Sequence, residues 1–351
     1  MALLAAIIAA PLSALRWRGP PSLPLMAAVS FLGWAVITAL WSPAHTIQAA
    51  RLILTLIGGA GCVLAARGLT EGGRAILRRV APGACALLIA LIAIEALFRA
   101  PVNRFFHPES LDWVLNKNPA KGAAILLCLI GPVMAWRLTK DARGYALTAA
   151  LVAATAWASL QFDDTANAVA FTFGAIMFAV GYALSGAAIR IGGALVALWA
   201  LLSPWLLRFA PFEDTLPYSW AVRLHVWRFA AERVAEKPWF GWGLDASRTF
   251  PQTIKVQDRI EAAIPLHPHN VFAQVWLETG AIGAVLLATA IVLSAWAGAR
   301  HATRAGAAGV MAAAGAIFVI DNFSFGVWQE WWLASCFLPA ILLAAQPKPA
   351  I

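Results

Sequence analysis

Residues 270–297 read NVFAQVWLETGAIGAVLLATAIVLSAWA and form the longest apolar run of the chain. A helix crosses the bilayer core with roughly 20 consecutive apolar residues, so this run predicts a membrane-spanning helix. Three polar side chains interrupt the run at intervals of four residues: Asn270, Gln274 and Glu278. This spacing places them on one stripe of the helix, and polar groups inside a membrane helix indicate a functional site.

The composition extends this prediction to the whole chain of 351 residues. Hydrophobic residues make up 61% of it and charged residues only 12%, which is too little polar surface for a soluble protein of this length. We therefore expect an all-α polytopic membrane protein with about eleven transmembrane helices, within a range of roughly ten to twelve. The apolar runs lie at residues 1–15, 22–41, 47–66, 76–98, 120–138, 144–161, 166–184, 190–208, 270–297, 305–320 and 331–346. The first run has two arginines after it and no basic residue before it, the reverse of a secretory signal peptide, so we expect it to remain as a helix.

The positions of the basic residues predict the orientation of these helices. Alternate short connections and the C-terminal tail carry Arg16, Arg18, Arg67, Arg74, Arg78, Arg79, Arg137, Lys140, Arg143, Arg190, Arg300, Arg304 and Lys348. Only Glu71 and Asp141 oppose them there. Short basic connections stay in the cytoplasm, which places the N-terminus outside and the C-terminus inside. The connections at 42–46, 99–119, 162–165, 209–269 and 321–330 are then expected on the non-cytoplasmic side.

This topology divides the chain into three regions. Residues 1–208 form an N-terminal bundle of about eight helices, residues 209–269 a large outer loop, and residues 270–351 about three C-terminal helices. A loop of that length is usually functional. Within it, residues 219–236 have helical periodicity and end just before Lys237-Pro238. The apolar stripe of this amphipathic helix contains Trp220, Leu224, Trp227, Ala230, Ala231 and Val234.

Arg223 falls inside that apolar stripe, where a guanidinium needs an anionic partner. The partner could be a diphosphate held by two hydrogen bonds, or a carboxylate in a structural ion pair. Arg228 lies outside the stripe and is either a substrate-binding residue or part of a solvated surface.

The segment His267-Pro268-His269-Asn270 stands where the outer loop enters the last long span. An imidazole with an ordinary pKa of about 6.5 can accept a proton near neutral pH, and we expect His269 to be the reactive one, with His267 supporting it. Glu278 either contributes to substrate binding or orients its neighbours by hydrogen bonding. Gly280 and Gly283 lie on nearly one face and are expected to let another helix pack closely.

Several functional classes are not supported by the sequence. The net charge of +9 is concentrated in the cytoplasmic connections, which argues against a nucleic-acid partner. Four cysteines, Cys62, Cys85, Cys128 and Cys336, lie in or beside apolar segments and do not indicate a disulfide framework. His267-x-His269 lacks a third ligand at a diagnostic spacing, so we expect no metal. No glycine-rich nucleotide loop follows a strand, so we expect no cofactor.

His269-Asn270, nine intervening residues and Gly280-x-x-Gly283 resemble the histidine motif of the O-antigen ligase family. These integral-membrane proteins join undecaprenyl-diphosphate-linked glycans to an acceptor. Two earlier pieces, Arg223-x-x-x-Trp227 and Pro238-x-x-Gly241-Trp242-Gly243, resemble segments of that family in the same order. The resemblance is good over residues 150–300, and Asn116-Lys117-Asn118-Pro119 matches a weaker asparagine-containing segment.

The resemblance implies a GT-C-like membrane glycosyltransferase with an inverting mechanism that is independent of metal and nucleotide. It makes Arg223 the group that holds the diphosphate and His269 the group that activates the acceptor hydroxyl. The candidate substrate-binding residues are Asn118, Arg228, His267, Asn270, Gln274 and Glu278. One segment departs from the family: a Ser-Arg pair is common where this chain has Asp163-Asp164-Thr165-Ala166-Asn167. The missing arginine could be replaced by Lys117, Lys121, Arg104 or Arg208.

The expected donor is an undecaprenyl-diphosphate-linked glycan, and several acceptors remain open. Transfer to lipid A-core defines an O-antigen ligase, transfer to another glycan an O-antigen or exopolysaccharide polymerase, and transfer to a protein an O-oligosaccharyltransferase. From a different class, the chain could be a transporter or flippase for a lipid-linked glycan, although it shows no inverted repeat. We expect it in the bacterial inner membrane, surrounded by membrane lipids, with its active site facing the periplasm.

Overall fold

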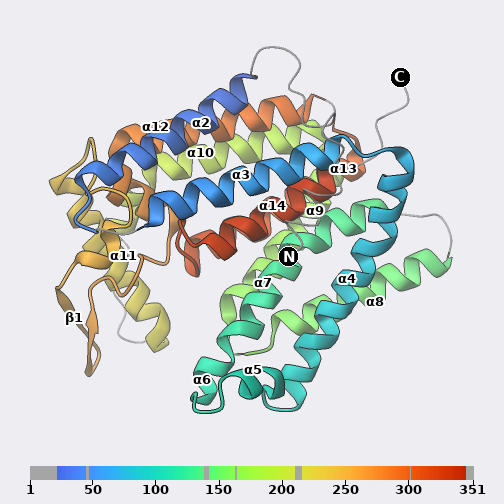
Figure 1. Cartoon of the computed structure of the whole chain (residues 1–351), viewed down its shortest axis with the longest axis horizontal. Helices are drawn as coiled ribbons and strands as arrows, with labels where there is room; N and C mark the ends of the chain where they lie inside the picture. Colours follow the sequence, from blue (N-terminus) through green and yellow to red (C-terminus); the bar gives the residue numbers. More distant parts are fainter. Residues whose placement is uncertain are drawn as a thin grey trace.

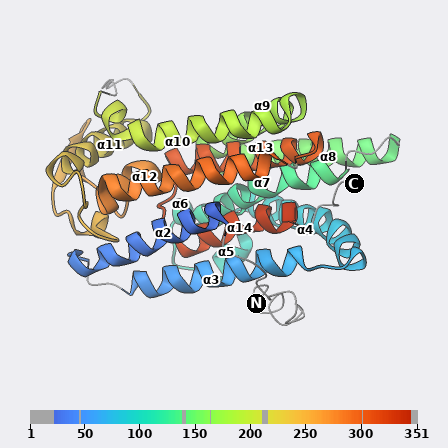
Figure 2. The same cartoon turned by 90° about the horizontal axis from the view of Figure 1, so that it is seen from above.

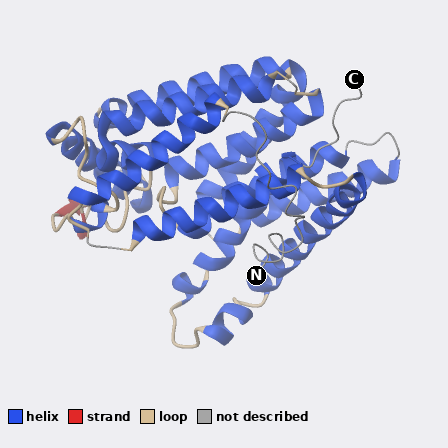
Figure 3. Ribbon diagram, turned by 45° about the horizontal axis from the view of Figure 1, so that its top comes forward, coloured by secondary structure: helices blue, strands red, loops and turns tan. Residues whose placement is uncertain are grey.

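A computed structural model describes residues 22–44, 47–137, 142–162, 164–209, 216–300 and 302–344. The predicted first span at residues 1–15 and Asp163 lie outside these described residues. The other ten predicted spans all correspond to helices, which dominate the structure (Figure 3). They are α2 (Leu23–Ile37, continued by the 3-10 turn η2, Thr38–Trp41), α3 (Gln48–Arg67), α4 (Glu71–Leu97), α7 (Lys117–Arg137), α8 (Ala142–Ser159), α9 (Thr165–Leu184), α10 (Gly186–Arg208), α12 (Val271–Ala299), α13 (Arg304–Phe323) and α14 (Glu330–Ala344).

The all-α polytopic membrane fold is confirmed. Eight of the described helices are long and apolar enough to cross a membrane. The two exceptions, α8 and α14, are apolar but shorter. The helices pack in two groups, with α2 on α12, α12 on α10 and α3 on α14 in one, and α4, α7 and α8 in the other (Figures 1 and 2).

Helix α13 lies between the two groups and contacts α7, α9, α10, α12 and α14. Small residues allow this close approach, because apolar helices in lipid associate mainly through van der Waals packing. A Cβ atom at Gly181 of α9 would lie 2.6 Å from the carbonyl oxygen of Ala307 on α13. A Cβ at Gly131 of α7 would lie 2.5 Å from the Cβ of Ala312, which is also on α13. The first half of α13 therefore packs closely against α7 and α9.

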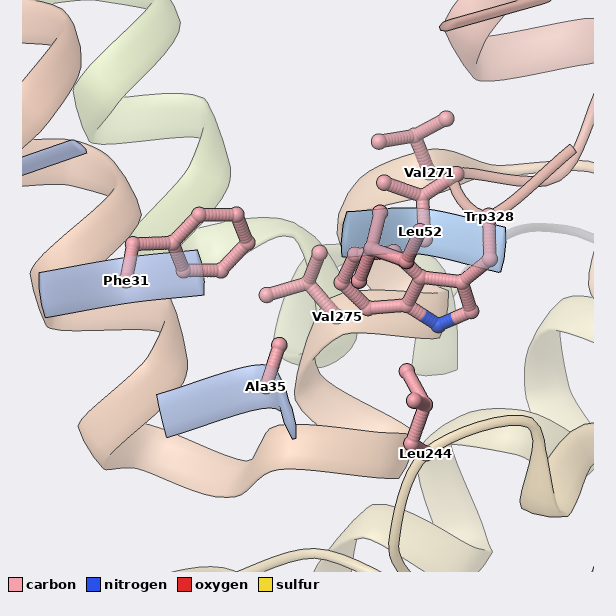
Figure 4. Close-up of a cluster of buried hydrophobic side chains, with 8 residues drawn as sticks. Phe31, Ala35, Leu52, Leu244, Val271, Val275 and Trp328 are labelled. Atoms are coloured by element: carbon pink, nitrogen blue, oxygen red, sulfur yellow. The ribbon is translucent and has the colours of Figure 1, made fainter. Parts of the chain in front are cut away.

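Three of the connections predicted to be non-cytoplasmic, 42–46, 209–269 and 321–330, meet at one end of the bundle. The Ser42 hydroxyl donates to the carbonyl of Leu244 (2.6 Å), and the Gln48 amide donates to the carbonyl of Trp328 (2.5 Å). Beneath these contacts, Leu52, Leu244, Val271 and Trp328 form an apolar cluster with Phe31 (Figure 4). Segments far apart in the sequence are thus fastened together beside the start of α12.

The outer loop folds into α11 (Tyr218–Glu236), a 3-10 turn η3 (Ala246–Thr249) and a small antiparallel hairpin. The helix matches the predicted range within one residue, and Trp227, Ala230, Ala231 and Val234 are buried as expected, together with Ala221 and Val226. The hairpin pairs β1 (Thr253–Val256) with β2 (Arg259–Ala262), and the sequence analysis missed it. Strands of four residues give too short an alternation of polar and apolar side chains to be recognised in a sequence.

The remaining described helices, α5 (Pro101–Phe106) and α6 (Asp112–Leu115), are short. They connect α4 to α7 and lie at the bottom of the view in Figure 1, below α7 and to the right of α11 and β1.

Candidate active site

His269 stands one residue before the N-cap of α12 in a left-handed backbone conformation, with φ of 54°. This conformation is uncommon for a residue with a side chain. Two hydrogen bonds hold it: the His269 N–H donates to Nδ1 of His267 (3.1 Å), and His269 Nδ1 lies 2.7 Å from the carbonyl oxygen of Ser324. A carbonyl only accepts, so Nδ1 carries the proton of the neutral imidazole. Nε2 is then the ring nitrogen with a free lone pair.

Arg223 reaches the same place from α11. Its Nε donates to the carbonyl of Phe323 (2.8 Å), and one terminal nitrogen donates to the carbonyl of Ser219 (2.9 Å). The guanidinium also lies 5.6 Å from the ring centre of Trp220. Among the described residues, no carboxylate lies within the 4.0 Å limit of an ion pair with Arg223. The carboxylate that acts on Arg223 is that of Asp164, which attracts it from beyond this distance.

The predicted pair is thus anchored on consecutive carbonyls at the end of α13. Trp227 adds a third link, because its indole N–H donates to the carbonyl of Pro268 (3.0 Å) and its ring packs against Phe323. The sequence analysis did not identify Phe323 and Ser324. Backbone carbonyls leave no side-chain signal in a sequence, so only the fold could reveal them.

The charges around His269 favour the neutral imidazole. Burial lowers its pKa to about 4, and the positive charges of Arg223 and Lys117 add to this effect, while the hydrogen bond to Ser324 opposes it. Burial likewise lowers the pKa of His267 to about 3, with further lowering by His269 and Arg248. Both histidines therefore carry no charge near neutral pH, and cations surround them.

Arg223 and Asp164 also influence each other, which brings the connection before α9 to the site. The Arg223 charge lowers the pKa of the Asp164 carboxyl, although burial raises it overall. Asp164 caps α9 by accepting from the Ala166 N–H (3.1 Å). Asp164 lies in the segment that resembles the family's Ser-Arg position. Of the four residues predicted to replace the missing arginine, Lys117 is the one whose charge affects the pKa of His269.

Helix α12 is broken at Gly280, where φ is 66° and ψ is −167°. The break frees carbonyl and amide groups, and the loop 238–243 pairs with them. Trp242 N–H donates to Leu277 (2.8 Å), Gly243 N–H donates to Glu278 (2.9 Å), and Ala281 N–H donates to Pro238 (2.8 Å). The two glycine-containing motifs of the sequence therefore bind each other directly.

The expected role of Gly280 in helix packing is wrong. A Cβ at Gly280 would lie 2.3 Å from the carbonyl oxygen of Trp239, so the glycine permits approach of a loop and not of a helix. At Gly283 a Cβ would first meet the Thr279 side chain of its own helix (1.8 Å) and then the Trp34 ring of α2 (3.3 Å). The prediction that Gly280 and Gly283 share one face holds only for an unbroken helix. The positive φ at Gly280 breaks the helix between the two residues and the preceding turn.

The geometry of these motifs agrees with comparisons to known proteins. The O-antigen ligase family model matches residues 120–288, which include Arg223, the 238–243 loop, His269 and the break at Gly280. Residues 120–288 belong to the O-antigen ligase family.

Curated relatives carry a related name. Proteins named "Putative polysaccharide ligase" from Rickettsia conorii and Rickettsia felis are 26% and 25% identical over 200 and 204 residues, 54% of this chain in each case and 48% and 49% of theirs. One from Rickettsia bellii is 33% identical over 146 residues, which are 38% of this chain and 34% of its own. The chain spans about half the length of the curated relatives it matches.

Within the O-antigen ligase segment, Asn270 is the N-cap of α12. Its side-chain oxygen accepts from the Ala273 N–H (2.9 Å), and its amide nitrogen donates to Asn322 (3.0 Å). Trp199 donates to the same Asn322 oxygen (2.8 Å). Asn270 is buried and engaged at both ends of its amide, so its contacts fix the direction in which α12 leaves the loop.

Glu278 is completely buried and is the centre of a hydrogen-bond network. One oxygen accepts from the Asp245 N–H (2.6 Å) and from the Trp328 indole, and the other accepts from the Ser247 hydroxyl and from Gln274 (3.0 Å). These bonds favour the orienting role over direct contact with substrate, because both carboxylate oxygens are occupied.

Gln274 extends the network towards His267. Its side-chain oxygen accepts from the Val327 N–H (3.0 Å). The adjacent Gly326 lies against the His267 ring, where a Cβ would come within 2.8 Å. Nε2 of His267 lies 3.1 Å from the amide nitrogen of Gln329. The polar stripe of α12 therefore shapes the wall behind the two histidines.

The last two predicted residues lie at the flanks. Arg228 is half-buried on α11, one position after Trp227. Asn118 is exposed near the start of α7, where it donates to the Asn103 side chain (2.9 Å) and accepts from Lys121 (3.3 Å). In the part of the chain that the structure describes, no three His, Cys, Asp or Glu side chains gather as metal ligands would.

Proposed function

We propose that this protein is a membrane glycosyltransferase that moves a glycan from an undecaprenyl-diphosphate carrier to an acceptor hydroxyl. The family and the names of the relatives support glycan ligation in general. The observation that carries the specific proposal is the convergence of His269 and Arg223 on the adjacent carbonyls of Ser324 and Phe323. It places an imidazole with a free lone pair beside a guanidinium that has no described carboxylate within 4.0 Å.

The proposed reaction needs one proton acceptor and one anion-binding group. The acceptor hydroxyl gives its proton to Nε2 of His269 while its oxygen attacks the anomeric carbon of the donor sugar. The bond from that carbon to the phosphate oxygen breaks, and its electron pair stays on that oxygen. The leaving group is the lipid-linked diphosphate. Attack opposite the leaving group inverts the anomeric configuration. No metal, nucleotide or other cofactor enters this scheme.

Arg223 is suited to hold the departing diphosphate. A guanidinium has five N–H donors, and only two of them serve the carbonyls of Phe323 and Ser219. The others are available for phosphate oxygens, with which arginine forms strong paired hydrogen bonds. The backbone contacts fix the orientation of the group before the substrate arrives.

Donor binding should also increase the basicity of His269. In the structure, the charges of Arg223 and Lys117 lower the pKa of this imidazole. A bound diphosphate would neutralise these charges, and the pKa of His269 would rise towards the range in which it accepts a proton more readily. The base would thus be strongest when the donor is in place.

The other predicted residues take supporting roles in this proposal. His267 holds the backbone of His269, and Asn270, Gln274 and Glu278 hold the surrounding walls. Arg228 and Asn118 flank the reaction centre on α11 and α7, where we assign them to contacts with the bound glycan.

We further propose that the site faces the periplasm from the bacterial inner membrane, with the N-terminus outside and the C-terminus in the cytoplasm. The contacts between predicted outer connections support their position on one side of the membrane, and the basic residues of the opposite connections are the reason to call that side the periplasm. Among possible acceptors we favour lipid A-core, which makes the reaction O-antigen ligation.

A reconstituted assay tests the proposal. Purified protein receives an undecaprenyl-diphosphate glycan and lipid A-core in the presence of a chelator and without nucleotide. Glycan on lipid A-core is the expected product, and its absence in the His269→Ala variant ties it to the site. Movement of the donor between leaflets without bond formation would instead identify a flippase.

Deletion in a native host identifies the acceptor. Loss of a ligase leaves full-length glycan on the carrier, whereas loss of a polymerase leaves single repeats on lipid A-core. Normal lipopolysaccharide together with unglycosylated protein would identify a protein O-oligosaccharyltransferase.

A further inference from the structure

A polar cavity lies between the end of α4, the short helices α5 and α6, and the connection after α8. These short helices are at the bottom of Figure 1. Its volume is about 300 Å³, at the lower end of the range for small-molecule sites. The lining includes Glu95, Arg99, Arg104, Asn116, Gln161 and Phe162.

The walls of this cavity are rigidly built. Glu95 is buried, and its carboxylate accepts from the N–H groups of Val102 (2.9 Å) and Asn103 (3.3 Å) and from the Asn103 side chain (2.9 Å). Asn118 of α7 donates to that same Asn103 side chain (2.9 Å). The predicted substrate residue Asn118 therefore fastens α5 in the position that closes the cavity.

The rim has an unusual backbone. Arg99, Ala100 and Phe162 all have positive φ, at 59°, 58° and 65°. Residues with side chains rarely adopt this conformation, and such residues gather at binding sites. Two separate connections, one after α4 and one after α8, thus bend sharply to form the same cavity.

The polar groups left available indicate the ligand. The Glu95 carboxylate is occupied by α5, and Arg104 is paired with Asp112 (2.8 Å). For Arg99, the described residues provide no carboxylate within 4.0 Å. The side-chain amides of Asn116 and Gln161 and the apolar Phe162 complete the lining, and the Gln161 amide nitrogen already donates to the Trp157 carbonyl (2.9 Å). Amides suit hydroxyl groups, and the guanidinium suits a carboxylate or phosphate.

Two residues of the cavity lining are close in sequence to charged groups that act electrostatically on the proposed reaction centre. Asn116 directly precedes Lys117, whose charge acts on His269. Phe162 lies two residues before Asp164, whose carboxylate interacts with Arg223. We propose that this cavity binds an acidic sugar residue of the glycan substrate and that Arg99 recognises its carboxylate or phosphate group. The identification of the ligand as part of the glycan rests on the proposed function.

Binding can be measured without transfer. The full chain is purified in detergent, and saturation-transfer NMR titrations compare methyl glucuronide and glucose 6-phosphate with neutral methyl glucoside. We expect each acidic probe, or one of them, to bind about tenfold more tightly than the neutral sugar, which is the effect of one charge-assisted hydrogen bond. Binding of only one acidic probe would identify the charged group.

Three variants locate the binding. Arg99→Gln should remove the preference for acidic probes, and Asn116→Asp should repel them while leaving methyl glucoside unchanged. Arg79→Gln, an exposed arginine at the other end of α4, is the matched control and should have no effect. Equal binding of acidic and neutral probes, or an unchanged preference in Arg99→Gln, would overturn the proposal.

The source of the acidic sugar is then assigned by competition. Excess methyl glucuronide should inhibit transfer from an acidic donor glycan if the cavity serves the donor, and transfer to an acidic acceptor if it serves the acceptor. His269→Ala should keep the Arg99-dependent binding. If that binding persists while the wild-type protein transfers no glycan, the proposed ligand site in the cavity is supported and the proposed transferase function is refuted.

Discussion

Arg223 and His269 are 46 positions apart in the sequence but donate to consecutive backbone carbonyls, those of Phe323 and Ser324, at 2.8 and 2.7 Å. The carbonyls belong to the end of α13, the helix that packs against both groups of the bundle. A cation from the outer loop and an imidazole from the start of α12 are thus positioned by a third element. The arrangement fixes both side chains without consuming Nε2 of His269.

Removing either side chain should abolish transfer. We expect His269→Gln and Arg223→Gln each to lower kcat/KM at least about a hundredfold, because each removes a group that acts in the transition state. Arg223→Lys should recover only part of the activity, since an ammonium lacks the forked geometry. The exposed residues His107 and Arg259 provide control variants, His107→Ala and Arg259→Gln. Near-normal turnover in His269→Gln would remove this residue from the reaction.

The pH profile should report the lowered pKa of His269. The neutral imidazole is the active form, so kcat/KM should be constant above about pH 5 and fall as pH drops through about 4. The acid limb of kcat, measured with donor bound, should lie at higher pH because the diphosphate neutralises the nearby cations. Initial rates should be measured from about pH 3.5 to about pH 8 in steps of about half a pH unit. These data separate the acid limb of kcat/KM from that of kcat. An acid limb of kcat/KM near 6.5 would contradict this assignment.

The same histidines should make folding stability depend on pH. Their pKa values in the folded protein, about 3 for His267 and about 4 for His269, lie below the ordinary value of 6.5. As pH falls from 6.5, the unfolded chain binds protons that the folded protein does not, so the free energy of unfolding decreases and levels off below about 3. Melting temperatures of wild type and His267→Asn at several pH values test this. The variant should lose less stability on acidification.

Gly280→Ala should destabilise the protein strongly. The backbone at this position, with φ of 66° and ψ of −167°, is unfavourable for alanine, and a Cβ would lie 2.3 Å from the Trp239 carbonyl. We expect a loss of about 1–3 kcal/mol from backbone strain, with a further loss from the displaced loop. Gly298→Ala is the control on the same helix, because no atom lies within 4 Å of its Cβ. Equal melting temperatures for the two variants would refute the proposed pairing of loop and break.

Glu278→Gln separates an orienting role from a catalytic one. The amide is nearly the same size, but its NH2 group would face donors such as Asp245 N–H or the Trp328 indole. An unsatisfied buried donor costs about 1–3 kcal/mol, so the melting temperature should fall. Residual activity should retain the wild-type pH profile, since Glu278 does not exchange protons with substrate. A stable variant with a shifted acid limb would show that Glu278 titrates in the reaction.

Hydrophobic patterning determined the membrane helices of this protein. A spanning helix needs a long apolar run irrespective of its neighbours, so ten of the predicted runs could be located before any contact was known. The amphipathic helix α11 was equally visible, because its stripe of apolar residues and the stop at Lys237-Pro238 are local features. The paired strands β1 and β2 were too short for such a pattern.

The sequence also marked the polar residues of the candidate site, but only the tertiary structure gave them distinct positions. Along a helix, Asn270, Gln274 and Glu278 look alike, whereas in the fold one caps α12, one supports the 326–328 turn and one is enclosed by donors. Gly280 looked like a packing glycine until the approach of the 238–243 loop showed a broken helix. Arg223 and His269 are brought together by backbone carbonyl groups at the end of α13. Every residue has such a carbonyl, so the sequence does not mark these two. Their location is set by helix packing, which no local pattern in the sequence contains.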